Sequence, residues 1–162
     1  MAFDAQMQAD LNAIINRLNR LEPFVRKNGQ ADMVEAAKFL AAAVKGRTPV
    51  GTKAHKRYPK LGGRKKAAKG SGKVLATYRP GNLRRSMQVL KFRRSAAAFV
   101  GAKLGNKTAD GYYAHMVERG TNTQNPQYYF KAAVSAAGTA TLRIATQLIQ
   151  RRISSFAKTN GF

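Results

Sequence analysis

The feature that most constrains this chain is a run of fifty residues, from Lys45 to Arg94, that holds seventeen Lys or Arg residues and no Asp or Glu. Charges of one sign repel each other, so such a run cannot form a folded core by itself. It must be presented by ordered segments on either side of it. We therefore expect an ordered N-terminal part, a basic middle and an ordered C-terminal part.

The whole chain is also strongly basic. Its 162 residues carry a formal charge of +23, while 44% of them are hydrophobic. The length predicts one domain with a modest core, and the charge predicts a negatively charged partner. Nucleic acid, an acidic protein surface and anionic lipid are all compatible with the charge alone. The chain has no cysteine, which excludes disulfides, thiolate nucleophiles and cysteine-based zinc sites.

The N-terminus lacks a basic segment followed by an apolar run, and no stretch of about eighteen apolar residues occurs. We expect a soluble protein that is not secreted and has no membrane partner.

Two helices are expected before the basic run. Apolar residues at Met7, Leu11, Ile14, Leu18 and Leu21 form one stripe, which Pro23 is expected to end. The stripe is expected to pack on its own domain, and a seam with a partner helix is the alternative. A second helix follows Asn28-Gly29 and ends near Gly46 and Pro49, with Asp32 and Glu35 expected in its first turn.

After these helices the periodicity predicts a loop and then alternating elements. Residues 48–82 show no period and read as a long mobile loop, whereas residues 87–92 and 97–101 read as a β-hairpin. A short helix is expected within residues 112–121, before Gly120, and a long helix from Tyr128 to about Phe156. The expected domain, residues 1–162, thus divides into N-terminal helices (1–46), a basic loop insertion (47–82) and a remainder (83–162).

The chemistry needed for catalysis is sparse. The stretch Gly70-Ser71-Gly72-Lys73 lacks the earlier glycine and the following hydroxyl of a phosphate-binding loop. The two histidines, His55 and His115, are sixty positions apart, and a hydrogen bond from His115 to Glu118 is the ordinary explanation of that spacing. We expect no catalytic residue, no metal and no cofactor, and therefore no enzyme.

The basic run is instead expected to contact a polyanion or an acidic partner, although a solvated face is the alternative. Contacts of Lys and Arg with phosphate do not depend on base sequence, and Tyr58, Tyr78 and Phe92 add the option of stacking on bases. The candidate contact residues are Lys53, Lys56, Arg57, Lys60, Arg64, Lys65, Lys66, Lys69, Lys73, Arg79, Arg84 and Arg85.

Three segments resemble a known family when they are taken in order. Residues 48–52 and 81–87 resemble its Pro-x-x-Thr-Gly-x-Leu-Arg-x-Ser-Ile segment, split here by the basic insertion. Residues 113–121 resemble its Tyr-Ala-x-x-Val-Glu-x-Gly-Thr segment, and residues 125–133 resemble its Pro-Ala-Gln-Pro-Phe-x-x-Pro-Ala entry into the last helix. The family is the tail-component family of tailed double-stranded DNA bacteriophages named for gene product ten of phage HK ninety-seven.

The resemblance implies an α+β fold, with a small antiparallel sheet packed against N-terminal and C-terminal amphipathic helices. It also implies a structural neck or tail-completion protein that forms a ring at the head-tail junction, with a hexamer favoured and a dodecamer possible. The implied partners are connector or head-closure proteins, tail terminator or tail tube proteins, and the genomic DNA in the channel. The expected location is the virion, after assembly in the host cytoplasm. The implied contacts between subunits involve Tyr113, Glu118, Arg119 and Thr121, although Glu118 could equally be a helix-surface charge.

The size of the charge favours protein neighbours over DNA alone. Six copies would carry six times +23, or +138. Duplex DNA bears about one charge per 1.7 Å of axis, so this charge corresponds to roughly 235 Å of DNA, far more than one ring can enclose. We therefore expect much of the basic surface to face acidic neighbouring rings. A sequence-independent nucleic-acid-binding module, with the basic loop as its binding site, is the alternative function.

Overall fold

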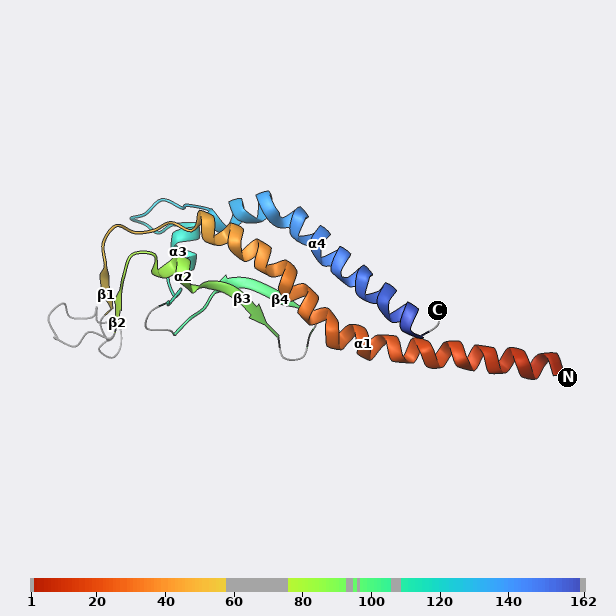
Figure 1. The fold of residues 1–162 in the computed structure, drawn as a ribbon. Coiled ribbons are helices and arrows are strands. Elements are labelled where there is room, and N and C mark those ends of the chain that lie inside the picture. The colour runs from red at the N-terminus through yellow and green to blue at the C-terminus, as the bar shows by residue number, and fades with distance from the viewer. Residues whose placement is uncertain (1, 58–75, 93–94, 96, 106–108, 161–162) are drawn as a thin grey trace.

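The structure is a computed structural model that describes residues 2–57, 76–92, 95, 97–105 and 109–160. Two long helices, α1 (Ala2–Arg47) and α4 (Tyr129–Asn160), run antiparallel, and a hairpin of β3 (Met87–Lys91) and β4 (Ala98–Ala102) lies against α1 on the side away from α4 (Figure 1). The short helices α2 (Asn82–Ser86) and α3 (Ala114–Arg119) and a second strand pair, β1 (His55–Arg57) and β2 (Ala76–Tyr78), complete the described elements. This arrangement confirms the expected α+β fold class.

The expectation of two N-terminal helices was wrong, because α1 continues through Pro23. Proline lacks the N–H that would bond the carbonyl of Asn19, and within a helix it costs about 3 kcal/mol. Packing beyond it compensates: the rings of Phe24 and Phe156, on α4, lie 4.6 Å apart between centroids. The predicted end of the helix is confirmed, since Thr48 donates from both its N–H and its hydroxyl to the Val44 carbonyl before Pro49.

Asp32 and Glu35 are correspondingly not first-turn residues, because they lie in the middle of α1. The buried Asp32 carboxylate accepts from Nε and Nη2 of Arg152 on α4, each at 2.6 Å. This hydrogen bond raises the pKa of Arg152 above its usual value. Two parallel bonds to one carboxylate fix the register of the two helices. Glu35 is exposed and pairs with Lys38 one turn later.

Small side chains let α1 and α4 approach closely. Many of the buried residues on the two helices are alanines, namely Ala36, Ala37 and Ala41 on α1 and Ala133, Ala137 and Ala145 on α4. Gly29 is also buried, in the part of α1 that faces Ile149 and Ile153 of α4. The Asp32–Arg152 pair adds a directional contact to this apolar packing.

The β3–β4 hairpin is confirmed as predicted. Its antiparallel register pairs Met87 with Ala102 and Leu90 with Phe99. Met87 joins the core cluster with Val44 of α1, Leu83 of α2, Val117 of α3, and Tyr129 and Ala133 of α4. At the turn end, the Gln30 side chain of α1 donates to the carbonyls of Phe92 and Ser95. The α3 and α4 helices are likewise confirmed, with α4 extending to Asn160.

The expectation of a loop without strands over residues 48–82 was wrong at both ends of that segment. β1 and β2 pair antiparallel, with His55 opposite Tyr78 and Arg57 opposite Ala76. A β-ladder of three residues is too short to leave a recognisable alternation in the sequence. The part of the expected loop between the strands, residues 58–75, lies outside the described residues.

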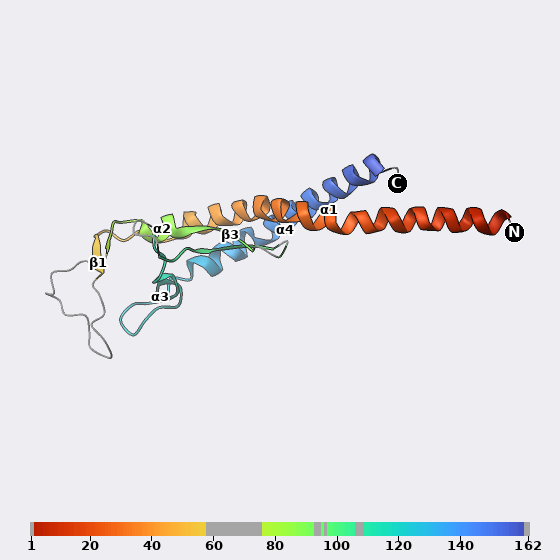
Figure 2. The ribbon, with the colours of Figure 1, turned by 90° about the horizontal axis from the view of Figure 1, so that it is seen from below.

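The expectation that the N-terminal stripe packs on its own domain was also wrong. Residues 2–20 of α1 extend past the end of α4, away from the rest of the molecule (Figures 1 and 2). Met7, Leu11, Ile14 and Leu18 are between 48% and 60% exposed. We call residues 2–20 the N-terminal arm.

Candidate functional site

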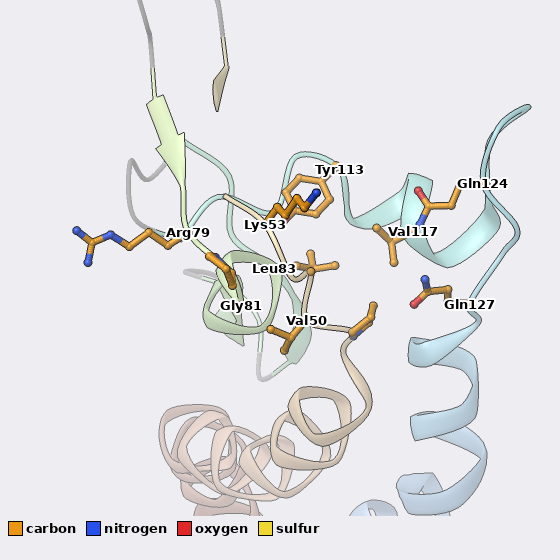
Figure 3. Close-up of a pocket in the computed structure, with 12 residues that line it drawn as sticks. Val50, Lys53, Arg79, Gly81, Leu83, Tyr113, Val117, Gln124 and Gln127 are labelled. Carbon is orange, nitrogen blue, oxygen red and sulfur yellow. The ribbon is translucent and has the colours of Figure 1, made fainter. Parts of the chain in front are cut away.

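The three segments that resemble the phage family come together around one depression. Its volume is about 300 Å³, and it lies between the end of α1, the start of α2 and the α3–α4 connection (Figure 3). Its lining residues come from all three segments and from the chain beside them: Pro49, Val50, Gly51, Lys53, Arg79, Pro80, Gly81, Leu83, Tyr113, Val117, Gln124 and Gln127. We call it the motif depression.

The motif depression has an apolar floor and a basic and polar rim. Leu83 and Val117 are buried, whereas Lys53 and Arg79 are exposed. The Arg79 side chain points away from the depression in Figure 3. The described residues that line the space include no carboxylate.

Residues 81–87 hold this region together. Gly81 has a φ of 77°, which favours glycine, and it starts α2. Leu83 and Met87 enter the core, and the buried Ser86 hydroxyl donates to the Leu83 carbonyl at 2.7 Å. The exposed Arg84 and Arg85 therefore lie between buried residues on both sides.

A group of buried polar residues centred on Asn82 and Asp110, which we call the polar node, lies next to the motif depression, because Asn82 stands between the lining residues Gly81 and Leu83. The Asp110 N–H donates to Asn82 Oδ1 at 3.0 Å, and Asn82 Nδ2 donates to the Asp110 carbonyl at 2.6 Å. The Tyr78 hydroxyl donates to Asp110 Oδ2 at 2.8 Å, while the N–H groups of Tyr112 and Gly105 donate to Oδ1. The node ties the end of the basic insertion to the loop before α3. Sequence reasoning missed it, because nothing in the spacing marks these residues as partners.

Glu118 has a role that sequence reasoning did not foresee. Its carboxylate accepts from the N–H of Phe130 at 2.8 Å and of Lys131 at 3.0 Å, at the N-terminus of α4. The first N–H groups of a helix lack partners within it, and the helix dipole favours a negative charge there. Burial, and secondarily the charge of Glu118, raises the pKa of the neighbouring Tyr129 to about 12. Glu118 thus joins α3 to α4 within one chain, and a second contact with another subunit remains an expectation.

The remaining residues of the same segment shape the turn that follows. Gly120 has a φ of 79°, and a Cβ there would lie 2.7 Å from the Gln124 carbonyl oxygen. Thr121 is exposed and accepts from the Thr123 N–H at 3.3 Å, and Arg119 is exposed. Tyr113 is half-buried and packs edge-on against Tyr112. Of the four expected subunit-contact residues, Arg119 and Thr121 are therefore the most accessible.

The described residues of the predicted polyanion surface lie at the end of the molecule opposite the N-terminus, on and beside β1, β2 and α2 (Figures 1 and 2). Lys53, Lys56, Arg79, Arg84 and Arg85 are exposed there. Arg85 also donates to the Pro80 carbonyl at 3.0 Å, and Arg57 belongs to β1. The other predicted contact residues lie outside the described residues: Lys60, Arg64, Lys65, Lys66, Lys69 and Lys73.

Within the part of the chain that the structure describes, no three His, Asp or Glu side chains gather in a way that could hold a metal ion. His115 is exposed. No described helix is long and apolar enough to cross a membrane. Comparison with protein-family models, curated proteins and solved structures found no match to this chain.

Proposed function

We propose that this protein is a structural virion protein of a tailed double-stranded DNA bacteriophage. In this proposal it forms a ring at the head-tail junction, as a neck or tail-completion protein, and joins the tail to the capsid connector around the DNA channel. The ring is a hexamer by preference, with a dodecamer as the alternative stoichiometry. The protein has no catalytic role in this account.

The observation that carries the proposal is the convergence of the three family-like segments on the motif depression. The two halves of the first segment, residues 48–52 and 81–87, lie far apart in the sequence, and the second and third segments are residues 113–121 and 125–133. Nevertheless, Pro49, Gly81, Val117 and Gln127 all line one space. Within these segments Thr48 ends α1, Asn82 holds the buried node, Glu118 caps α4 and Gly120 allows a turn. Residues with purely architectural tasks are what a structural protein requires, and none of these tasks is chemical.

The distribution of charge and apolar surface supports assembly. The exposed cations Lys53, Lys56 and Arg84 lie at one end of the molecule, and the exposed arm stripe lies at the other. A molecule with two different ends can contact two different molecules. In this proposal the basic end meets an acidic neighbouring ring, with channel DNA as a second contact.

Electron microscopy of the purified protein mixed with the connector of its phage tests the proposal. We expect rings seated on the connector, and we expect them to weaken as salt rises, because the proposed contact is electrostatic. A protein that never enters a ring with the connector would contradict the proposal.

The second candidate function, a sequence-independent nucleic-acid-binding module, is favoured by the density of cations in residues 45–94. Deleting residues 62–73 separates the two functions. A binding module should lose its affinity for duplex DNA, and the steep salt dependence of that affinity, when these residues are removed. A ring subunit should assemble as before.

A further inference from the structure

The N-terminal arm carries an apolar stripe that is exposed among the described residues. Met7, Leu11, Ile14 and Leu18 follow steps of four and three along α1, which places them on one face. All four are about half exposed, and Ile15 beside them is 44% exposed. A contiguous exposed stripe of this kind usually marks a contact with another molecule.

The described elements cannot cover this stripe while α1 remains one helix. The arm is the N-terminal extension of the same helix whose C-terminal half packs on α4 and on the hairpin. Figures 1 and 2, taken 90° apart, both show the arm directed away from these elements. Another molecule is therefore the natural partner of the stripe.

The hairpin offers a second uncovered apolar face. Met87, Val100 and Ala102 face the core, so the alternating positions Leu90 and Phe99 point to the opposite side. Leu90, Phe92 and Phe99 are 38% to 52% exposed, and the two phenylalanine rings stack edge-on with centroids 4.5 Å apart. We call this surface the outer hairpin face.

The first part of the arm and the rest of the chain are opposite in charge. Residues 2–16 contain Asp4 and Asp10 and no Lys or Arg, while the arm as a whole, with Arg17 and Arg20, is neutral. The full +23 therefore resides outside the arm. Exposed lysines lie at the ends of the two strands of the hairpin, Lys91 as the last residue of β3 and Lys103 directly after β4. Residues 2–16, which carry two negative charges and no positive one, would thus be attracted by the basic body of another copy rather than repelled by it.

We propose that the N-terminal arm of one copy lies on the outer hairpin face of a neighbouring copy. This contact uses two different surfaces, so it is head-to-tail and can close into a ring, which a symmetric pairing of two arms cannot do. The arm is about 28 Å long at ~1.5 Å per residue, enough to cross a two-stranded hairpin in any direction. The choice of a head-to-tail contact rests on the ring proposed above.

Engineered cysteines test the contact, because the natural chain has none. Full-length Leu11→Cys and Ile14→Cys chains are each mixed with full-length Phe99→Cys chains and treated with a short bismaleimide crosslinker. Asn12→Cys and Asn16→Cys, on the opposite face of the arm, are the matched controls. We expect arm-to-hairpin heterodimers several-fold more abundant with the stripe cysteines than with the controls.

Paired charge variants then measure what the contact contributes. Leu11→Asp/Ile14→Asp places two charges on the stripe, and Asn12→Asp/Asn16→Asp places the same two charges on the opposite face. We expect the concentration for half-assembly, from native mass spectrometry, to rise more than about 100-fold for the stripe variant. The control should change it less than about 3-fold. Circular dichroism checks that both variants keep their helix content.

The outcomes separate this contact from the proposed function. Rings that persist in the stripe variant, or stripe cysteines that crosslink only to each other in a dimer, would overturn the arm-to-hairpin contact and leave the ring function standing. Arm-to-hairpin crosslinks in rings that never bind a phage connector would support the contact and overturn the function. A wild-type chain that stays monomeric would overturn both.

Discussion

Asn82 and Asp110 satisfy each other's polar groups in both directions. The Asp110 N–H donates to the Asn82 side-chain oxygen at 3.0 Å, and the Asn82 side-chain amide donates to the Asp110 carbonyl at 2.6 Å. Both residues are 2% exposed. If one side of such a buried pair is removed, the polar groups of the other side lose a hydrogen bond that water does not readily replace. The pair therefore holds the loop before α3 against the start of α2.

Replacing Asn82 by alanine should lower the free energy of unfolding by about 2–3 kcal/mol, because the Asp110 N–H and carbonyl then lose a buried partner. Urea denaturation measures this change. The exposed neighbour Arg84 provides the control: Arg84→Ala should change the stability by less than about 0.5 kcal/mol. Equal effects of the two substitutions would contradict the structural role of the node.

The Glu118 carboxylate should stabilise α4 from outside that helix. Glu118→Ala should cost about 1–2 kcal/mol, because two N–H groups at the start of α4 lose their acceptor. Glu118→Gln should cost less, since it keeps one side-chain oxygen. The matched control is Glu35→Gln, whose exposed pair with Lys38 contributes less than about 0.5 kcal/mol. If urea denaturation showed Glu118→Ala to be no more destabilising than this control, the hydrogen bonds of Glu118 to the start of α4 would not contribute to stability.

Glycine is required at position 120 but not at position 46. Gly120→Ala should destabilise by about 2–3 kcal/mol or more, because the backbone conformation favours glycine and the new Cβ would clash with Gln124 and Pro126. In contrast, a Cβ at Gly46, in the last turn of α1, would have no atom within 4 Å. Gly46→Ala should therefore stabilise by about 0.5–1 kcal/mol. In thermal unfolding, the midpoint temperature should therefore fall for Gly120→Ala and rise for Gly46→Ala.

Stability at high pH should depend on Tyr129. Its folded pKa of about 12 lies above the value of 10.0 for an unfolded tyrosine. The folded state therefore favours the neutral phenol, so its contribution is fully present below pH 10 and is lost as the pH rises towards 12. Between pH 8 and pH 11 the wild type should lose more free energy of unfolding than Tyr129→Phe, by about 1 kcal/mol. Parallel pH profiles for the two proteins would contradict this assignment.

Locally encoded elements were predictable from the sequence, and elements decided by distant contacts were not. The hairpin was predicted because Leu90 and Val100 belong to short alternating segments, and α3 because Gly120 stops it. The break at Pro23 was wrong because the packing of Phe24 on Phe156 outweighs a local penalty. The periodicity of a sequence does not predict a contact such as that of Phe24 with Phe156, which are more than a hundred positions apart.

The candidate site shows the same division. The segments around Asn82 and Glu118 could be recognised by their resemblance to a family, but their tasks could not be read from the sequence. Asn82 and Asp110 are 28 positions apart, and Glu118 acts on N–H groups 12 and 13 positions later. Hydrogen bonds between loops leave no periodic signal. The exposure of the arm stripe was similarly invisible, because a stripe that packs on its own domain has the same spacing.

Native mass spectrometry of the full-length protein, alone and with the connector of its phage, tests the central claim most directly. The proposed function predicts a closed ring of defined stoichiometry, six copies by preference or twelve, that binds the connector as a single complex. A protein that remains monomeric at every concentration, with and without the connector, would contradict it.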